Sequence, residues 1–379
     1  MVEKRRIAIL AVRFGNGHWQ AARVLKGALE EAYPGVQVEV INYLVFAGLL
    51  FDWLTRLAYH DLMIRIPWLY RRFFAYTNQL RPGSLFQRII NACGRRRFLR
   101  YLRRAEPVLL ISTFPVPAAV ASHLKRRGLI NRPLVTVITD YTLHRQWLQP
   151  GTDLFIVANE ALAEDMIGLG VPSPKVKATG IPVDPRFGER KGYTPGHLLP
   201  GLSPAEEKLP LVLVINGATS FGGELPSICR LLADFPLPLI GVVLGVRHPR
   251  LRLALRRAVR KRRNRVFILG YSRQVPEFME AAACLISKTG GMTVSESLAA
   301  ELPMIIYRPL PCQEEGNRDF LVQAGAALAP RSLEELAEDL KRLLTEPELR
   351  ARMQKAASRL KKPDAARAAA LLLEPYLNK

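Results

Sequence analysis

The sequence has few cysteines, an excess of basic over acidic residues, and no long uninterrupted apolar stretch. Its four cysteines, Cys93, Cys229, Cys284 and Cys312, have no paired spacing. They therefore predict neither a disulfide framework nor a zinc site, and they are typical of a reducing compartment. The longest uncharged stretch, 107–124, is interrupted by prolines and predicts a strand, a turn and a helix rather than a membrane span. The apolar run at the N-terminus is too short for a signal peptide and predicts a first buried strand.

The charge balance is strongly basic. The chain has 55 Lys and Arg against 33 Asp and Glu, a formal net charge of +22. This excess predicts attraction to an anionic partner, either a phosphate polymer or an acidic lipid surface. With 379 residues, 49% hydrophobic and 23% charged, the chain is otherwise typical of a globular protein large enough for two domains.

Short apolar and β-branched runs alternate with amphipathic helical patterns along the whole chain. This alternation is typical of parallel α/β sheets. The segment 180–210 is rich in proline and glycine, and it indicates a linker between two domains. We predict strands at 7–12, 36–41, 108–111, 134–138, 154–157 and 176–178 before this segment, and at 211–215, 239–244, 266–269, 284–286, 304–306 and 327–328 after it.

The segment 287–317 carries the strongest functional signal. A strand is followed by the small-residue turn 289–291, by a helix, and after a further strand by a polar turn ending at Gln313-Glu314. A strand, a glycine turn and a helix N-terminus together present unpaired backbone N–H groups that bind phosphate. The accompanying polar residues favour a nucleotide-sugar site over an ordinary βα turn. They are Thr289, Ser295, Glu296, Gln313, Glu314 and Asn317.

A second glycine-rich turn follows the first predicted strand. Gly15, Asn16 and Gly17 permit a sharp change of backbone direction, and His18 then lies in the first turn of a helix. There an imidazole either takes a proton from a hydroxyl at neutral pH or hydrogen-bonds its own loop. Asp140 follows a later strand at the same edge, where it either orients His18, holds an acceptor hydroxyl, or caps its loop.

These segments resemble the monogalactosyldiacylglycerol synthase and processive diacylglycerol glucosyltransferase family. Its members are inverting GT-B glycosyltransferases related to the N-acetylglucosaminyltransferase of the peptidoglycan lipid intermediate. The matching positions are Gly17-His18 with Ala21-Ala22, the cluster 139–147, the turn 180–183, and 287–317. Asn16 and Cys312 stand where the family usually has glycine, and Thr289 where it usually has proline.

The resemblance implies an α/β fold of the GT-B type. Two Rossmann-like domains would face a central cleft, and the C-terminal helix would cross back to the N-terminal domain. We expect an N-terminal acceptor domain at 1–186, a linker at 187–209, a UDP-sugar-binding domain at 210–362, and a final helix at 363–379.

The resemblance also implies a role for individual residues. His18 and Asp140 would be catalytic, with Gly15, Asn16 and Gly17 forming the acceptor loop. Glu296 would bind the ribose, and Gln313 with Glu314 the hexose. The full predicted donor site is Gly217, Thr219, Tyr271, Thr289, Gly290, Gly291, Met292, Thr293, Glu296, Gln313, Glu314 and Asn317.

The sequence has no Asp-x-Asp motif, which glycosyltransferases that use a metal commonly carry. Helix N-termini and backbone N–H groups would then stabilise the leaving diphosphate. We therefore predict no metal and no cofactor besides the donor substrate.

The segment 43–104 is an insert rich in arginine and aromatic residues. It contains twelve arginines, no lysine, two acids and thirteen of the thirty aromatics. The composition suits a membrane-surface element, in which rings enter the headgroup region and arginines meet lipid phosphates. Helices packed on the core with a solvated basic face would have the same composition. The predicted membrane residues are Trp53, Trp68, Arg71, Arg72, Phe73 and Phe74.

The resemblance, together with the basic insert and the net charge, thus implies a peripheral enzyme on the cytoplasmic face of a membrane. It would move a hexose from a UDP-hexose to diacylglycerol or a glycosyl-diacylglycerol, and an anionic membrane surface, not nucleic acid, would be its partner. The alternatives are a UDP-N-acetylglucosamine transferase to a polyprenyl-diphosphate lipid and a UDP-sugar epimerase of the same fold. A nucleic-acid-binding protein would explain the charge but not the loops at 289–317.

Overall fold

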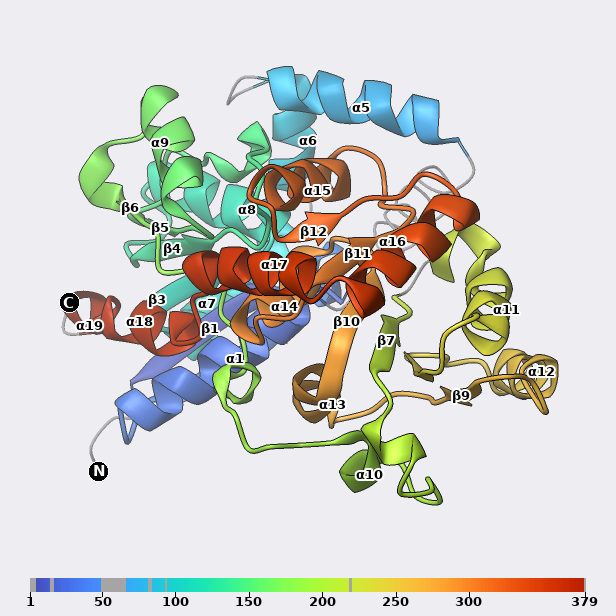
Figure 1. The fold of residues 1–379 in the computed structure, drawn as a ribbon. Coiled ribbons are helices and arrows are strands. Elements are labelled where there is room, and N and C mark those ends of the chain that lie inside the picture. Colours follow the sequence, from blue (N-terminus) through green and yellow to red (C-terminus); the bar gives the residue numbers. More distant parts are fainter. Residues whose placement is uncertain are drawn as a thin grey trace. The chain divides into compact units, whose positions relative to one another are not determined.

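The protein is described from a computed structural model, which covers residues 5–13, 17–48, 66–80, 84–92, 94–217 and 220–377. The chain forms two compact units. The first consists of Met1–Asp184, Pro311–Gln313 and Asp364–Lys379, and the second of Pro185–Leu310 and Glu314–Pro363. Figure 1 shows the ribbon of the chain.

The first unit contains a six-stranded parallel sheet in the order β2-β1-β3-β4-β5-β6. All six strands predicted before residue 180 are present, with ends shifted by at most two residues. Parallel strands in this order require crossover connections, which the intervening helices provide. The strands are β1 (Arg6–Ala11), β2 (Gln37–Asn42), β3 (Leu109–Ser112), β4 (Leu134–Val137), β5 (Leu154–Ile156) and β6 (Val176–Lys177).

Both faces of this sheet are covered. In β1, Ile7 and Ile9 belong to one hydrophobic cluster, while Ala8 and Leu10 belong to another on the opposite face. This division follows from the two-residue period of a strand, and continuous apolar runs are typical of sheets buried on both faces. The helices are α1 (Gly17–Ala32), α2 (Leu44–Ala47), α5 (Pro67–Gln79), α6 (Leu85–Ala92), α7 (Arg95–Ala105), α8 (Pro115–Arg126), α9 (Glu160–Gly168), α18 (Ala365–Leu371) and α19 (Glu374–Leu377).

The C-terminal helices pack in the first unit. Ala369, Ala370, Leu373 and Leu377 are buried in the same cluster as β1 and α1, and Figure 1 shows α18 beside α1. The Tyr33 hydroxyl at the end of α1 also donates to the carbonyl of Ala370 (3.3 Å). The predicted return of the final helix to the N-terminal domain is therefore confirmed.

The two ends of the insert 43–104 are part of the core. Tyr43 and Phe98 are fully buried, with ring centroids 5.4 Å apart in an edge-to-face arrangement. The opposite face of α7 exposes five arginines and provides a solvated basic surface. They are Arg96, Arg97, Arg100, Arg103 and Arg104. Core packing thus explains α2 and α7, whereas α5 has exposed aromatic residues that core packing does not explain.

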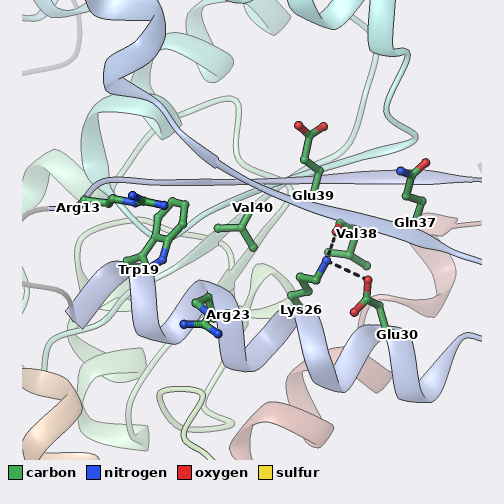
Figure 2. Close-up of a pocket in the computed structure, with 9 residues that line it drawn as sticks. All are labelled: Arg13, Trp19, Arg23, Lys26, Glu30, Gln37, Val38, Glu39 and Val40. Atoms are coloured by element: carbon green, nitrogen blue, oxygen red, sulfur yellow. Dashed lines mark hydrogen bonds and ion pairs between the residues drawn. The ribbon is translucent and has the colours of Figure 1, made fainter. Parts of the chain in front are cut away.

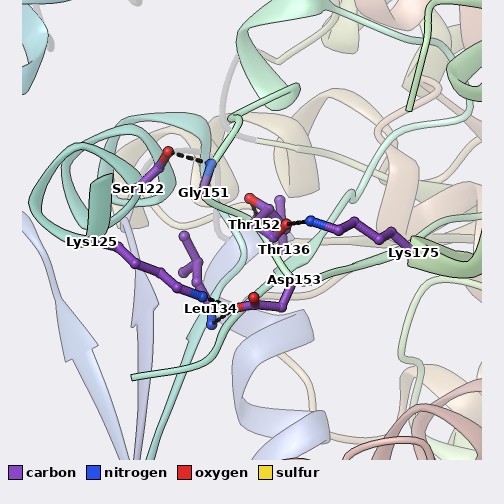
Figure 3. A network of polar contacts seen from close by, with 8 residues as sticks. All are labelled: Ser122, Lys125, Leu134, Thr136, Gly151, Thr152, Asp153 and Lys175. Atoms are coloured by element: carbon purple, nitrogen blue, oxygen red, sulfur yellow. Dashed lines mark hydrogen bonds and ion pairs between the residues drawn. The ribbon is translucent and has the colours of Figure 1, made fainter. Parts of the chain in front are cut away.

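Polar contacts fasten the loop that precedes β5 (Figure 3). The Asp153 carboxylate accepts from Lys125 Nζ of α8 and from the backbone N–H of Leu134 (2.7 Å). The Gly151 N–H donates to Ser122 Oγ (2.8 Å), and a Cβ at Gly151 would lie 2.9 Å from Ser122 Cα. The loop therefore sits directly on α8, and glycine is needed at this close approach. Around it, Thr136 and Thr152 share a hydrogen bond and Lys175 Nζ donates to the Thr152 carbonyl.

The second unit contains a parallel sheet in the order β12-β11-β10-β7-β8-β9. All six strands predicted after residue 210 are present. They are β7 (Leu211–Ile215), β8 (Ile240–Leu244), β9 (Arg265–Ile268), β10 (Ala282–Ser287), β11 (Met304–Ile306) and β12 (Ala327–Leu328). The longer helices are α11 (Leu225–Asp234), α12 (Pro249–Ala258), α13 (Val275–Ala281), α14 (Gly291–Ala299), α15 (Gln313–Gln323), α16 (Leu333–Thr345) and α17 (Pro347–Leu360).

The proline-rich segment before β7 has structure of its own. It contains three short helical turns: η4 (Pro185–Gly188), α10 (Pro195–Leu198) and η5 (Glu206–Lys208). The Glu280 carboxylate at the end of α13 accepts from the backbone N–H groups of Lys191 (2.6 Å) and Gly192 (2.7 Å). These contacts attach the segment to the second unit.

Candidate functional site

In the first unit, His18 lies at the carboxyl edge of the sheet. It is the second residue of α1, and Gly17 is the first. Gly15 and Asn16 of the predicted acceptor loop lie outside the described residues. Thr139, which follows β4, places its hydroxyl 2.7 Å from His18 Nδ1, and the Phe114 ring stands edge-on to the imidazole at 4.9 Å. The Thr113 hydroxyl donates to the His18 carbonyl (3.0 Å).

This environment keeps the imidazole uncharged. Burial lowers the pKa of His18 to about 4, and a hydrogen bond to the Thr113 backbone raises it by a smaller amount. At neutral pH the ring is therefore a free base that can accept a proton, which an imidazolium cannot do.

Asp140 follows Thr139 directly and is 8% exposed. The structure thus brings the segment with Asp140 to His18, and the described hydrogen bond at His18 Nδ1 comes from Thr139. The sequence identified Thr139 only as a neighbour of Asp140. Its role as the partner of His18 could be found only from the fold.

In the second unit, several predicted donor residues meet at the turn between β10 and α14. Thr289 is fully buried, and its hydroxyl donates to the Glu314 carbonyl. Asn317 Nδ2 donates to the Thr289 carbonyl (2.9 Å), and Glu314 Oε2 accepts from the Leu310 N–H (2.7 Å). These bonds clamp the start of α15 onto the glycine turn. Gln313 and Glu314 lie in the first turn of this helix, not on the predicted polar turn. Gln313 is half-buried.

The glycines of this turn are not needed for a left-handed backbone. Their lack of a side chain leaves the backbone open to a ligand. Gly290 has φ −61°, which any residue adopts, and Gly291 begins α14. A Cβ at Gly290 would lie 3.9 Å from Glu314 Oε1, so the bare backbone leaves open space beside the helix N-terminus. Unpaired N–H groups at that end bind anions. On α14 itself, Met292 is buried, and Thr293 and Glu296 are half-buried.

Lys288 adjoins this turn and was not among the predicted site residues. It is only 7% exposed, and burial lowers the pKa of its ammonium. Within the described part of the chain, Lys288 Nζ makes no hydrogen bond or ion pair; it lies 5.9 Å from the Phe221 ring centroid. Burial likewise raises the pKa of Glu314, and the Lys288 charge opposes that rise. A cation this buried without an ion-pair partner is suited to an anionic ligand.

The neighbouring strand ends in a second unsatisfied group. Asn216 follows β7, is 8% exposed, and its Oδ1 has no hydrogen-bond partner among the described atoms. Gly217 comes next and is exposed, while Thr219 lies outside the described residues. Since β7 and β10 are adjacent, Asn216 and Lys288 follow neighbouring strands at the carboxyl edge of one sheet. Tyr271, after β9, is 73% exposed.

The predicted membrane residues fall on two faces of α5. Trp68 is 64% and Phe73 43% exposed, and Arg71 and Arg72 are also exposed. Phe74 differs, because its ring packs edge-on against His144 at 4.4 Å on the inner side of α5. Trp53 lies outside the described residues.

The described residues include no group of His, Cys, Asp or Glu able to hold a metal ion. No helix among them is long and apolar enough to cross a membrane.

A groove of about 710 Å³ lies between α1 and β2 (Figure 2). The Arg13 guanidinium stacks over Trp19 (4.2 Å), and Lys26 Nζ donates to the Val38 carbonyl (2.8 Å) and pairs with Glu30 (3.1 Å). None of the predicted site residues lines it, and its charges are of both signs. We do not regard it as the active site.

Comparison with known proteins defines the class of this chain. Residues 18–183 match the family model described as monogalactosyldiacylglycerol (MGDG) synthase, and residues 238–360 match glycosyl transferases group 1. Among solved structures, MurG of Acinetobacter baumannii superposes with a TM-score of 0.64 at 15% identity, covering 98% of this chain and 99% of that one. A putative UDP-N-acetylglucosamine 2-epimerase from Listeria monocytogenes gives 0.62 at 14% identity, covering 100% and 98%. The protein is a glycosyltransferase with the GT-B fold.

The resemblance predicted from the sequence is also confirmed. Its N-terminal part matches the MGDG synthase model and its C-terminal part matches the group 1 glycosyl transferase model. It is 27% identical over 367 residues to the processive diacylglycerol beta-glucosyltransferase of Bacillus cytotoxicus, covering 97% of this chain and 92% of that protein.

Proposed function

We propose that this protein transfers a hexose from a UDP-sugar to diacylglycerol or a glycosyl-diacylglycerol. The observation that carries the proposal is the buried Lys288 beside an open helix N-terminus, in a chain similar throughout to a diacylglycerol glucosyltransferase. The first feature suits the diphosphate of the donor. The similarity supplies the lipid acceptor.

The donor is held in the second unit. The N–H groups at the start of α14 and the Lys288 ammonium donate hydrogen bonds to the diphosphate oxygens. They stabilise its negative charge, so the reaction needs no metal there. Glu296, one turn further along α14, binds the ribose hydroxyls. Gln313 and Glu314 position the hexose, and the clamp from Thr289 and Asn317 fixes the start of α15 that carries them.

The reaction is a single displacement with inversion at the anomeric carbon. The neutral His18 imidazole takes the proton of the acceptor hydroxyl, and the hydroxyl oxygen forms a bond to the anomeric carbon. The bond from that carbon to the UDP oxygen breaks, and its electron pair leaves with UDP. Support comes from the position of His18 in the first turn of α1, at the carboxyl edge of the sheet, where its ring is unprotonated at neutral pH.

The acceptor is taken from the cytoplasmic face of a membrane, on which the protein lies peripherally through α5. Trp68, Leu69, Phe73 and Tyr76 are exposed on this helix, beside the exposed Arg72. Aromatic rings exposed beside arginines are typical of helices that lie in the headgroup region of anionic bilayers. The net charge of +22 favours the same surface.

Incubation of the purified protein with anionic vesicles tests the proposal. The vesicles contain diacylglycerol or a polyprenyl-diphosphate lipid, and each sample receives UDP-glucose, UDP-galactose or UDP-N-acetylglucosamine. We expect a glycosyl-diacylglycerol from one of the two hexose donors. Transfer only to the polyprenyl lipid, or epimerisation of the donor without any lipid product, would contradict the proposal.

A further inference from the structure

The helix α5 has two faces with different chemistry. Its outer face exposes Trp68 and Tyr76, at 64% and 59%. Its inner face buries Tyr70 and Thr77, at 9% and 4%. Thr77 is a polar residue on that buried face, and a buried hydroxyl needs a hydrogen-bond partner. The partner shows which segment the helix is attached to.

That partner is His144 in the segment 139–147. Thr77 Oγ1 lies 3.2 Å from His144 Nε2, and the Phe74 ring packs on the imidazole. Two further bonds join the same elements. Gln146 Nε2 donates to the Thr77 carbonyl (3.1 Å), and the Arg145 N–H donates to Asn78 Oδ1 (2.8 Å).

The direction of these bonds follows from one fixed donor. The Gln146 backbone N–H donates to His144 Nδ1 (3.2 Å), so Nδ1 carries no proton. Burial lowers the pKa of His144 to about 4, so at neutral pH its single proton is on Nε2. Nε2 then donates to the Thr77 hydroxyl, which donates in turn to the carbonyls of Phe73 and Phe74 (both 3.0 Å). Every polar group in this chain of bonds is satisfied.

The other end of the same segment holds His18. Thr139 bonds His18 Nδ1 at 2.7 Å, and the fully buried Trp147 has its ring 6.2 Å from the imidazole. Nine consecutive residues, 139–147, thus connect the inner face of α5 to the imidazole proposed as the base.

We propose that His144 is a positioning residue. When α5 binds a lipid surface, the bond between His144 and Thr77 fixes the segment 139–147, and this segment holds Thr139 and His18 in the reactive arrangement. This inference rests on the proposed function, because it requires a lipid surface and His18 as the base. It predicts that the rate of transfer depends on the surface, and not only on the concentration of the acceptor.

The test compares Thr77→Val, which keeps the shape and removes the hydroxyl, with Thr77→Ser, which keeps the hydroxyl. Transfer to diacylglycerol is measured in anionic vesicles and in uncharged detergent micelles, and UDP binding and vesicle sedimentation are measured separately. We expect T77V to bind UDP and vesicles as the wild type does but to lose about tenfold of its vesicle rate, as expected for one buried hydrogen bond. Its rate in micelles stays unchanged. T77S retains the stimulation, by which we mean the ratio of the rate in vesicles to the rate in micelles.

A purely structural role for Thr77 would lower both rates together, and that result would overturn the inference, as would a T77V protein that keeps the full stimulation. If T77V does not fold, the half-buried Asn78 provides a second pair. Asn78→Ala removes the acceptor of the Arg145 N–H and should lower the stimulation, whereas Asn78→Asp retains it. Equal rates for the wild type in vesicles and micelles would remove this inference but leave the proposed function intact. The absence of any glycolipid would remove the proposed function as well.

Discussion

The two units build their polar sites at the same place, the turn after a parallel strand where a helix begins, yet the two turns have opposite electrostatics. In the first unit, β1 leads to α1 and a neutral His18, whose contacts are a threonine hydroxyl and an aromatic ring. In the second, β10 leads to α14 and a buried Lys288 with open glycine backbone. Burial lowers the pKa of both side chains. The first turn is thus suited to accept a proton, and the second to bind an anion.

Removing the imidazole should have the largest effect on this contrast. His18→Ala is expected to lower kcat about a thousandfold, because a positioned general base contributes about 10² to 10⁴. UDP affinity should stay within twofold of the wild type, since the proposed donor site lies in the other unit. Steady-state kinetics together with calorimetric titration of UDP check both parts. A variant that loses UDP binding, or that keeps its kcat, would contradict the assignment.

Removing the positive charge of Lys288 should weaken the proposed anion site of the second unit. Lys288→Met keeps the length of the side chain without its charge, and kcat/KM for the UDP-sugar should fall about a hundredfold, as for loss of one preorganised group at a developing negative charge. Lys288→Arg should recover part of this loss because it restores the charge. The free energy of unfolding of K288M should not fall, because an ammonium that is costly to bury is removed. Unchanged donor kinetics in K288M would show that Lys288 does not contact the diphosphate.

Packing behind the first turn can be tested without touching the site. Gly151→Ala places a Cβ 2.8 to 2.9 Å from Ser122 and should lower the free energy of unfolding by about 1–3 kcal/mol. Gly168→Ala is the matched control, because Gly168 ends α9 with nothing within 4 Å of its Cβ. It should be neutral or stabilise by about 0.5–1 kcal/mol. Urea unfolding of both variants measures the difference, and equal stabilities would mean that α8 and the loop adjust freely.

The neutral histidines also predict a dependence of stability on pH. The pKa values of His18 and His144 are about 4 in the folded protein and near 6.5 when unfolded. Between these values the unfolded chain binds more protons, so the free energy of unfolding should fall as the pH is lowered from about 6.5 to about 4. Histidine proton resonances followed by NMR titration locate both pKa values. A His18 that titrates near 6.5 would contradict its burial.

The sequence was sufficient for the sheets and for the two turns. All twelve strands could be predicted, and the signal is clearest for inner strands, because parallel strands buried on both faces are continuous apolar runs, such as Ile7–Ala11 within β1. Glycines between such a run and a helical pattern placed both turns. These signals are local, so they can be read without the fold.

The remaining features depend on what packs beside each residue. Lys288 is unusual because its side chain is 7% exposed, which the sequence does not indicate, and Thr139 is a partner of His18 across 121 positions of sequence. Phe74 and Phe73 are adjacent and chemically identical, yet one packs on His144 and the other is exposed. Composition therefore indicated a membrane-surface helix but could not assign its two faces.

The central claim is that a neutral imidazole and a metal-free anion site together carry out a single displacement on a lipid hydroxyl. The most direct measurement is the anomeric configuration of the product, by proton NMR of glycolipid made from UDP-glucose, whose own linkage is α. The account predicts a glucosyl-diacylglycerol with a β linkage. An α linkage, or release of free glucose without a lipid product, would contradict it.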